Sequence, residues 1–391
     1  MPRARACPAP APRALAPPGS VGEAGSRLGS VSAHAAGGRA ASGQRPRITD
    51  VARVARVSPT TVSHALSGAR GVREETRERV LAAVRELGYV PDRVATGLRR
   101  QRTGIIGFVG SGIATTPFAG ELIAGAHDAA SERDVLLLVV DSQGDEALEA
   151  RQIELLLGQR VDGIAIARMF HQAVDQPEIP IDVPVALVNA ESVGGWLVDA
   201  VAPDEEEIGR MAARRLLEAG HRRIAFANTV DDTLASRGRE AGLRAVLAEA
   251  GVRLRVADVA HVASTAEGGR EAAVELLDRP GRPTAVFCFN DQVAMGVMQV
   301  AQALGIDVPC ECSVIGVDDL ANVADALVPK LTTIRLPHQE MGRWAVTRLL
   351  DRVAGEDPDV ESATIPCRLV ERESVAPPPA PSTSTSTTTP L

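Results

Sequence analysis

Short apolar runs alternate with amphipathic segments from residue 104 onward. Runs of four to six mostly apolar residues predict strands at Ile105–Val109, Val135–Val140, Gly163–Ala167, Val185–Val188, Arg223–Ala227, Ala285–Phe289 and Val314–Val317. Helical periodicity lies between them, at Leu122–Glu132, Ala147–Leu157, Ile208–Ala219, Arg239–Ala250, Gly268–Leu277 and Gln292–Leu304. This alternation predicts doubly wound parallel sheets. This part of the chain has about 270 residues, which exceeds the usual size of a single domain. We therefore expect two α/β lobes with a ligand cleft between them.

Residues 45–90 have a different pattern, that of short helices. The segment from Ser58 to Leu66 begins with a good N-cap, and Pro59 suits a first helical turn. Its apolar residues recur at helical spacing and face inward, which leaves Pro59, Thr60, Ser63 and His64 outward. A further amphipathic helix is predicted at Thr76–Leu87. Before Ser58, the residues Val51, Ala52, Val54 and Ala55 form the apolar face of another short helix. Two short helices with small polar groups on the second predict a helix-turn-helix, with a generic three-helix bundle as the alternative.

Composition excludes several classes of protein. Apolar residues make up 45% and aromatic residues only 2%, so a packed core is expected but no stacking platform for single-stranded nucleic acid. No run approaches the ~18 apolar residues that span a bilayer, so we expect no membrane partner. Five cysteines do not make a disulfide framework. Cys310 and Cys312 lack partners at zinc spacing, and no enzyme motif or cofactor fingerprint stands out, so neither metal nor cofactor is expected.

Charge is distributed unevenly along the chain. The net charge is −8, yet residues 1–102 carry an excess of eleven positive charges, which leaves −19 on the rest. A basic module on an acidic body favours contact with a polyanion through that module alone.

The two ends have the composition of disordered tails. Residues 1–44 are mostly Ala, Pro, Gly, Ser and Arg, and residues 376–391 are rich in Pro, Ser and Thr. Such segments bury too little apolar surface to offset their ordering entropy.

No apolar core of a signal peptide follows the first arginines, so we expect a cytoplasmic protein.

Several collinear motifs resemble the LacI/GalR (lactose-repressor) family. They begin with RITDVARVARVSPTTVSHAL at residues 47–66 and ETRERVLAAVRELGYVPD at residues 75–92. In the body the matching pieces are VAPD (201–204), GHRRIA (220–225), REAG (239–242), FNDQ (289–292), VIGVDD (314–319) and LTTI (331–334). The resemblance covers residues 47–372. It implies a small all-α helix-turn-helix head and two lobes like those of periplasmic binding proteins.

The resemblance implies that the second helix enters the major groove of double-stranded operator DNA. Pro59, Thr60 and His64 would then face base edges, whereas Ser58, Thr61 and Ser63 would hold phosphates or the backbone. His64 stands where the family commonly has arginine. Arg56 stands where the family usually has a turn glycine, so a positive φ there would cost about 1 kcal/mol.

Residues 91–103 resemble the family's hinge helix, which folds on the operator and wedges a leucine into the minor groove. The matching residue is Leu98, with Ala95 beside it. A plain linker is the alternative. The body would then span residues 104–375.

The family's effector pocket carries over to Phe118, Asn189, Arg239, Asn290 and Asp318. An arginine, a carboxylate and two amides give directional donors and acceptors for a polyhydroxylated ligand.

Other polar residues near these motifs are expected to be structural. Asp204 is expected to cap a helix, Asp319 to act as a cap or surface residue, and His221 to be structural.

Together these features predict a transcriptional regulator, a repressor, that binds a pseudo-palindromic operator as a homodimer and responds to a small effector such as a sugar. The alternative is a solute-binding protein of a transporter with the same two-lobed fold. The basic head and the missing signal sequence speak against it.

Overall fold

The structure is a computed structural model that describes residues 46–66, 71–89, 102–113, 116–356 and 359–380. It divides into two compact units, a head (Met1–Gln101) and a body (Arg102–Leu391). The expected tail at 1–44, the hinge positions Ala95 and Leu98, and the last eleven residues, 381–391, lie outside the described residues.

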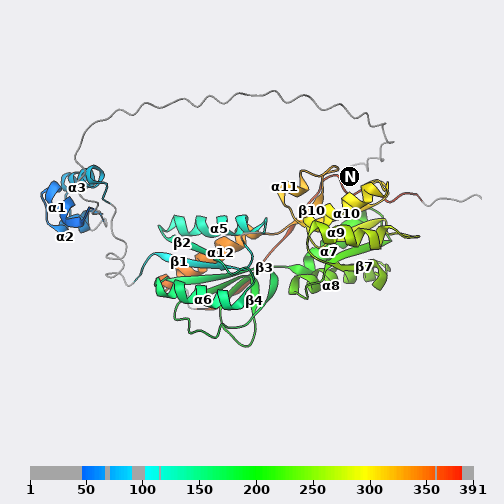
Figure 1. The fold of residues 1–391 in the computed structure, drawn as a ribbon, viewed down its shortest axis with the longest axis horizontal. Coiled ribbons are helices and arrows are strands. Elements are labelled where there is room, and N and C mark those ends of the chain that lie inside the picture. Colours follow the sequence, from blue (N-terminus) through cyan, green and yellow to red (C-terminus); the bar gives the residue numbers. More distant parts are fainter. Residues whose placement is uncertain (1–45, 67–70, 90–101, 114–115, 357–358, 381–391) are drawn as a thin grey trace, which may run out of the picture. The chain divides into compact units, whose positions relative to one another are not determined.

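The described part of the head consists of three helices, α1 (Ile48–Ala55), α2 (Pro59–Leu66) and α3 (Glu74–Leu87) (Figure 1). Val51, Val62 and Val80, one from each helix, are fully buried at their common centre. The expected arrangement of helices is confirmed. Helix α3 begins two residues before the expected Thr76, because two glutamates occupy its first turn, where the helix dipole favours negative charge.

The first lobe of the body is a parallel six-stranded sheet in the order β11-β5-β4-β3-β1-β2. Its strands are β1 (Ile105–Gly110), β2 (Leu136–Asp141), β3 (Gly163–Val174), β4 (Val185–Ser192), β5 (Asp199–Pro203) and β11 (Ser362–Ile365). Its helices are α5 (Ala119–Glu132), α6 (Glu146–Gly158) and α12 (His338–Ala354). They bury apolar residues on the two faces of the sheet, as a doubly wound fold requires.

The second lobe repeats this plan in the order β12-β10-β9-β8-β6-β7. Its strands are β6 (Ile224–Thr229), β7 (Val259–Val262), β8 (Ala285–Cys288), β9 (Ser313–Asp318), β10 (Thr332–Arg335) and β12 (Arg368–Val370). Its helices are α7 (Glu205–Glu218), α8 (Leu234–Glu249), α9 (Ala266–Leu277), α10 (Asp291–Ala303), the short α11 (Ala321–Ala324) and the 3₁₀ turn η1 (Val256–Asp258). Only β12 pairs antiparallel, against β10.

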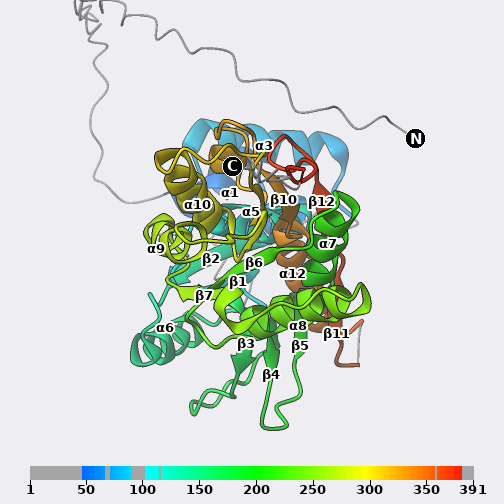
Figure 2. The same ribbon diagram turned by 90° about the vertical axis from the view of Figure 1, so that its right-hand side faces the viewer.

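The chain passes between the lobes three times. It leaves the first lobe after β5 to begin α7, returns after β10 to form α12, and crosses again from β11 to β12. The expected two-lobed parallel fold is therefore confirmed, with a first lobe built from two separate stretches of sequence. Figure 2 shows α7 and α8, two neighbouring helices of the second lobe.

Glycines allow helices to pack at very short distance. In the α5–α12 pair, a Cβ added at Gly125 would lie 1.8 Å from the carbonyl oxygen of Gln339. In the α7–α8 pair, a Cβ added at Gly242 would lie 1.9 Å from the carbonyl oxygen of Glu206. Real Cβ atoms do not approach backbone so closely, so each helix pair depends on the absence of a side chain.

The body extends beyond its expected end at residue 375. The N–H of Ala376 donates to Ser313 Oγ at 3.0 Å, and its carbonyl accepts from His221 Nε2 at 2.9 Å. Residue 376, which composition assigned to a disordered tail, is therefore bonded to the second lobe.

Candidate functional site

Helix α2 presents the polar surface expected of a helix that reads DNA. Ser58, Pro59, Thr60 and His64 are exposed, while Thr61 and Ser63 are half-buried. Val62 and Ala65 face the head's core, as the periodicity predicts. The expected outward position is confirmed for Pro59, Thr60 and His64, whereas Ser63, also expected outward, is half-buried. The contacts of these residues with DNA stay predictions.

The start of α2 is fixed by local bonds. The N–H of Thr61 donates to Ser58 Oγ at 3.1 Å, and the two hydroxyl oxygens lie 2.8 Å apart. Ser58 is therefore the N-cap, as predicted. Arg56 before it has φ 53° and ψ 49°, so this arginine occupies the left-handed conformation that a turn glycine would adopt without strain.

In the body, a cavity of about 330 Å³ is lined by residues of both lobes: Pro117, Phe118, Glu121, Asp318, Leu320, Ala321, Asn322 and His338. The rings of Phe118 and His338 stack with their centroids 4.5 Å apart and their planes 7° from parallel. Two of the five residues predicted to bind effector, Phe118 and Asp318, thus share one cavity wall. His338 was not singled out from the sequence, and the helix that it begins, α12, was not among the predicted helices.

Burial favours the uncharged forms of two ionisable residues of this cavity, Asp318 and His338. It raises the pKa of Asp318 well above its ordinary value, and the nearby carboxylate of Asp291 raises it further, against the opposing charge of Arg239. Burial also lowers the pKa of His338 to about 3, helped by the positive charge of Arg239. Both ring nitrogens of His338 are buried without a hydrogen-bond partner. The imidazole of His338 is therefore uncharged at neutral pH and can donate through one ring nitrogen and accept through the other.

Arg239 does not line this cavity, because its guanidinium is already engaged. Its Nε donates to Glu205 Oε2 at 2.7 Å, and its Nη1 donates to the carbonyl oxygen of Phe289 at 2.6 Å. The guanidinium also lies over the Phe289 ring, 4.5 Å from the centroid. Both members of the ion pair are buried. The sequence did not reveal Glu205 as the partner, because 34 residues separate it from Arg239.

The two predicted asparagines lie apart from the cavity and hold backbone. Asn290 caps α10, accepting from the N–H of Val293 at 2.8 Å and donating to the carbonyl of Ser264 at 3.0 Å. Asn189 donates to the carbonyl oxygens of Arg168 and Met169, both at 3.1 Å, and its Oδ1 is buried without a partner.

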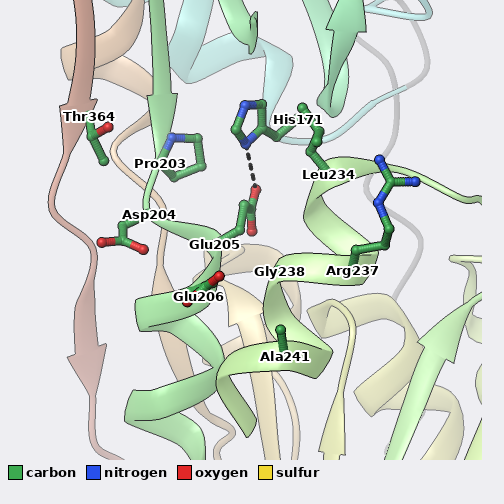
Figure 3. A pocket seen from close by; sticks show the side chains of 10 residues that line it. All are labelled: His171, Pro203, Asp204, Glu205, Glu206, Leu234, Arg237, Gly238, Ala241 and Thr364. Carbon is green, nitrogen blue, oxygen red and sulfur yellow. Dashed lines mark ion pairs between the residues drawn. The ribbon is translucent and has the colours of Figure 1, made fainter. Parts of the chain in front are cut away.

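A second cavity, of about 460 Å³, lies where α7 and α8 begin (Figure 3). The first lobe contributes His171 of β3, Pro203 of β5 and Thr364 of β11, and the second lobe contributes the N-terminal parts of both helices. Figure 3 shows His171 facing Glu205, with Nδ1 3.9 Å from Oε1. Glu205 Oε1 and both nitrogens of His171 are buried without a hydrogen-bond partner.

Other polar residues have the structural roles that were expected, with one exception. Asp204 caps α7, accepting from the N–H of Glu207 at 2.9 Å. His221 is buried between Thr284 and Ser313. Asp319 is neither a helix cap nor a surface residue: it is largely buried and accepts from Arg372 Nη2 at 2.7 Å, a partner 53 residues away that local sequence could not indicate. In the described ranges no helix is both long and apolar enough to cross a membrane.

Two family models match the chain. Residues 47–92 match the bacterial regulatory proteins of the lacI family. Residues 103–373 match the periplasmic binding proteins and sugar binding domain of the LacI family.

Curated relatives agree with these models. The HTH-type transcriptional repressor PurR of Yersinia enterocolitica is 33% identical over 334 residues, which are 85% of this chain and 97% of that protein. PurR of Escherichia coli is 32% identical over 339 residues, with the same shares covered.

Solved structures are similar over the same extent. The lac repressor dimer bound to operator and the anti-inducer ONPF aligns with a TM-score of 0.74 and 26% identity, over 85% of this chain and all of that one. The complex of the transcriptional regulator CelR with cellobiose aligns with a TM-score of 0.63 and 32% identity, over 84% of this chain and all of that one.

These matches span both the helix-turn-helix head and the two-lobed body, and they agree with the exposed polar face of α2 and the cavity between Phe118 and Asp318. The chain therefore belongs to the LacI family, and it is a DNA-binding transcriptional regulator whose body binds a small effector.

Proposed function

We propose that this regulator is a cytoplasmic repressor that binds a pseudo-palindromic operator as a homodimer and takes an uncharged, hydroxyl-rich effector in the cavity between Phe118, Asp318 and His338. Two identical heads match two half-sites, because operator symmetry mirrors protein symmetry. The lac repressor dimer on its operator and the CelR–cellobiose complex support the two halves of this proposal.

The choice of effector rests on the residues that line the cavity, which include no lysine or arginine. Burial favours the uncharged forms of Asp318 and His338, and Arg239, whose charge acts on the pKa values of both, is paired with Glu205. A carboxylate or phosphate entering here would meet no unpaired cation among the lining residues. Hydroxyl groups would instead find an acceptor and donor in Asp318 and in the imidazole of His338, and the face of a sugar ring would pack on the stacked aromatic pair.

Matched ligands test this assignment. Thermal shifts of the full chain are measured with neutral sugars such as cellobiose and glucose, with their acid counterparts such as gluconate, and with neutral purine bases, because PurR is among the relatives. Ligands that bind the native state raise its melting temperature by mass action. A neutral sugar should stabilise the protein and the matching acid should not. Stabilisation by the acids alone would contradict the proposal. Stabilisation by a purine base alone would show that the effector is a heteroaromatic base and not a sugar.

The role of Arg239 needs a paired substitution. Truncating it alone would leave Glu205 buried and unpaired, which costs about 3–5 kcal/mol and confuses ligand loss with unfolding. The double variant Arg239→Met with Glu205→Met removes both charges together. If Arg239 acts on the effector only through the charge balance of the cavity, this variant should still bind operator and keep part of its effector response. Complete loss of response in a folded variant would show that the guanidinium grips the ligand directly.

A further inference from the structure

We infer that the cavity at the start of α7 and α8 is a second ligand site, which takes a small organic ammonium, that is, a protonated amine on a short alkyl chain. The site shares no lining residue with the cavity between Phe118 and Asp318. One buried carboxylate oxygen of Glu205 and the walls around it define this site.

Glu205 supplies the charged acceptor. Its side chain is 5% exposed and is fixed by the bond from Oε2 to Arg239. Its other oxygen, Oε1, is buried, has no hydrogen-bond partner, and belongs to the wall of the cavity. An ionised oxygen left without a donor costs free energy that a ligand N–H or O–H would recover.

His171 supplies a second acceptor on the opposite wall. Burial lowers the pKa of this imidazole, so it is neutral and one ring nitrogen carries a lone pair. Neither ring nitrogen has a hydrogen-bond partner, and Nδ1 lies 3.9 Å from Glu205 Oε1. A group that donates to both at once must carry several hydrogens on one atom, which an ammonium does.

The remaining charged groups leave the wall negative. Arg237 is paired with Asp232, and Glu206 is paired with Arg210. Asp204 caps α7 and Thr233 caps α8, so one N–H group in the first turn of each helix already has an acceptor, and the carboxylate of Asp204 opposes the entry of an anion. Pro203, Leu234 and Ala241 make the apolar part of the wall, against which a short alkyl chain would pack.

A metal ion fits the same acceptors less well. Among the residues that the structure describes, no group of three or more His, Cys, Asp or Glu side chains is arranged to hold a metal. One imidazole and one carboxylate oxygen supply fewer ligands than protein metal sites use. The organic ammonium is therefore the occupant that the residues favour.

The experiment titrates the full chain with three probes of nearly equal size, 1-butylammonium chloride, sodium butyrate and 1-butanol, by calorimetry at pH 7.5 and constant ionic strength. We expect saturable binding of one butylammonium per chain and no saturation with the other two. No saturation with butylammonium, or tighter binding of butyrate, would overturn the proposal. DNA is absent, so the result is independent of the proposed repressor function.

Three variants locate the site. Ala241→Leu adds a helix-compatible side chain at an exposed position of the wall and should weaken butylammonium binding at least tenfold without lowering the melting temperature. Glu205→Gln should weaken it by a similar factor. Asn322→Ala, on the wall of the other cavity, is the matched control and should leave the affinity unchanged. Unchanged affinity in Ala241→Leu would overturn the assignment, even if Glu205→Gln does not fold.

Discussion

Arg56 joins α1 to α2 in a backbone conformation that side chains rarely adopt. Its φ of 53° is typical of glycine, and only the tight turn between the two helices holds it there. Gly88, which ends α3, has a similar φ of 60°, and a Cβ at that position would meet nothing within 4 Å. The head thus contains one strained arginine and one relaxed glycine in the same conformation.

We expect a glycine at position 56 and an alanine at position 88 to change the stability of the head in opposite directions. Arg56→Gly should stabilise the head by about 0.5–1 kcal/mol, and Gly88→Ala should destabilise it by about 1 kcal/mol, since an L side chain is sterically disfavoured in this region. Hydrogen exchange of amides in α1 and α3 of the full chain measures the free energy of opening. Destabilisation by Arg56→Gly would mean that contacts of the arginine side chain outweigh the backbone strain.

His64 lies on the exposed face of α2. We therefore expect that removing its side chain reduces discrimination between the operator and random DNA. His64→Ala should weaken binding to the specific operator by about 1–3 kcal/mol and leave binding to random duplex nearly unchanged, because only base contacts carry sequence information. The measurement compares dissociation constants on the two duplexes at one salt concentration. An equal loss on both would assign His64 to the phosphate backbone.

At the scale of elements, the strand centres were predictable but the lobe edges were not. Every predicted strand and helix of the body is present, because continuous apolar runs and helical periodicity marked them. Of the strands that were missed, β5, β10, β11 and β12 lie next to the crossings between the lobes, and β7 lies at the edge of the second sheet. These strands are three to five residues long, and some carry polar or charged residues, as in Thr332–Arg335, so the local sequence gives little signal of a strand.

The candidate site was predictable to a similar degree. Phe118 and Asp318 could be placed by their motifs, and they share a cavity. The partners that decide the chemistry, Glu205 for Arg239 and His338 for Phe118, come from distant positions with no local signal.

Because α5 packs closely on α12, we expect alanine substitutions at two glycines of α5 to change the stability of the body in opposite directions. Gly125→Ala would place a Cβ 1.8 Å from the Gln339 carbonyl, so α12 must move away and stability should fall by about 1–3 kcal/mol or more. A Cβ added at Gly120, in the same helix, would have nothing within 4 Å of it, so Gly120→Ala should gain about 0.5–1 kcal/mol from helix propensity. Urea unfolding of the body measures both. Equal behaviour of the two variants would refute the packing argument.

For the whole molecule, buried ionisable groups link stability to pH in both directions. Burial lowers the pKa of His221 to about 4, below its value near 6.5 in an unfolded chain. The unfolded state therefore binds more protons below about pH 6.5, and the stability that His221 contributes is lost as the pH falls towards 4. Asp291 acts oppositely, because burial raises its pKa to about 7, so its contribution is lost as the pH rises through 7.

Because these contributions oppose each other, one variant is needed to isolate His221. The free energy of unfolding of the wild type minus that of His221→Gln should fall by up to about 1.4 kcal/mol per pH unit between about pH 6.5 and 4. Urea titrations of both proteins at several pH values give this difference. A difference that does not change with pH would show that His221 is protonated as readily in the folded protein as in the unfolded chain.

The three crossings between the lobes also set the order in which the body can fold as it is synthesised. The second lobe from α7 to β10 is one continuous stretch, whereas the first lobe needs α12 and β11 from the far end of the chain. About 200 residues separate α5 from its partner α12, which takes on the order of 10–40 seconds of translation at ordinary rates. During that interval the apolar face of α5 that α12 will cover stays exposed to water. We therefore expect the nascent first lobe to be the part of this protein that most needs a chaperone.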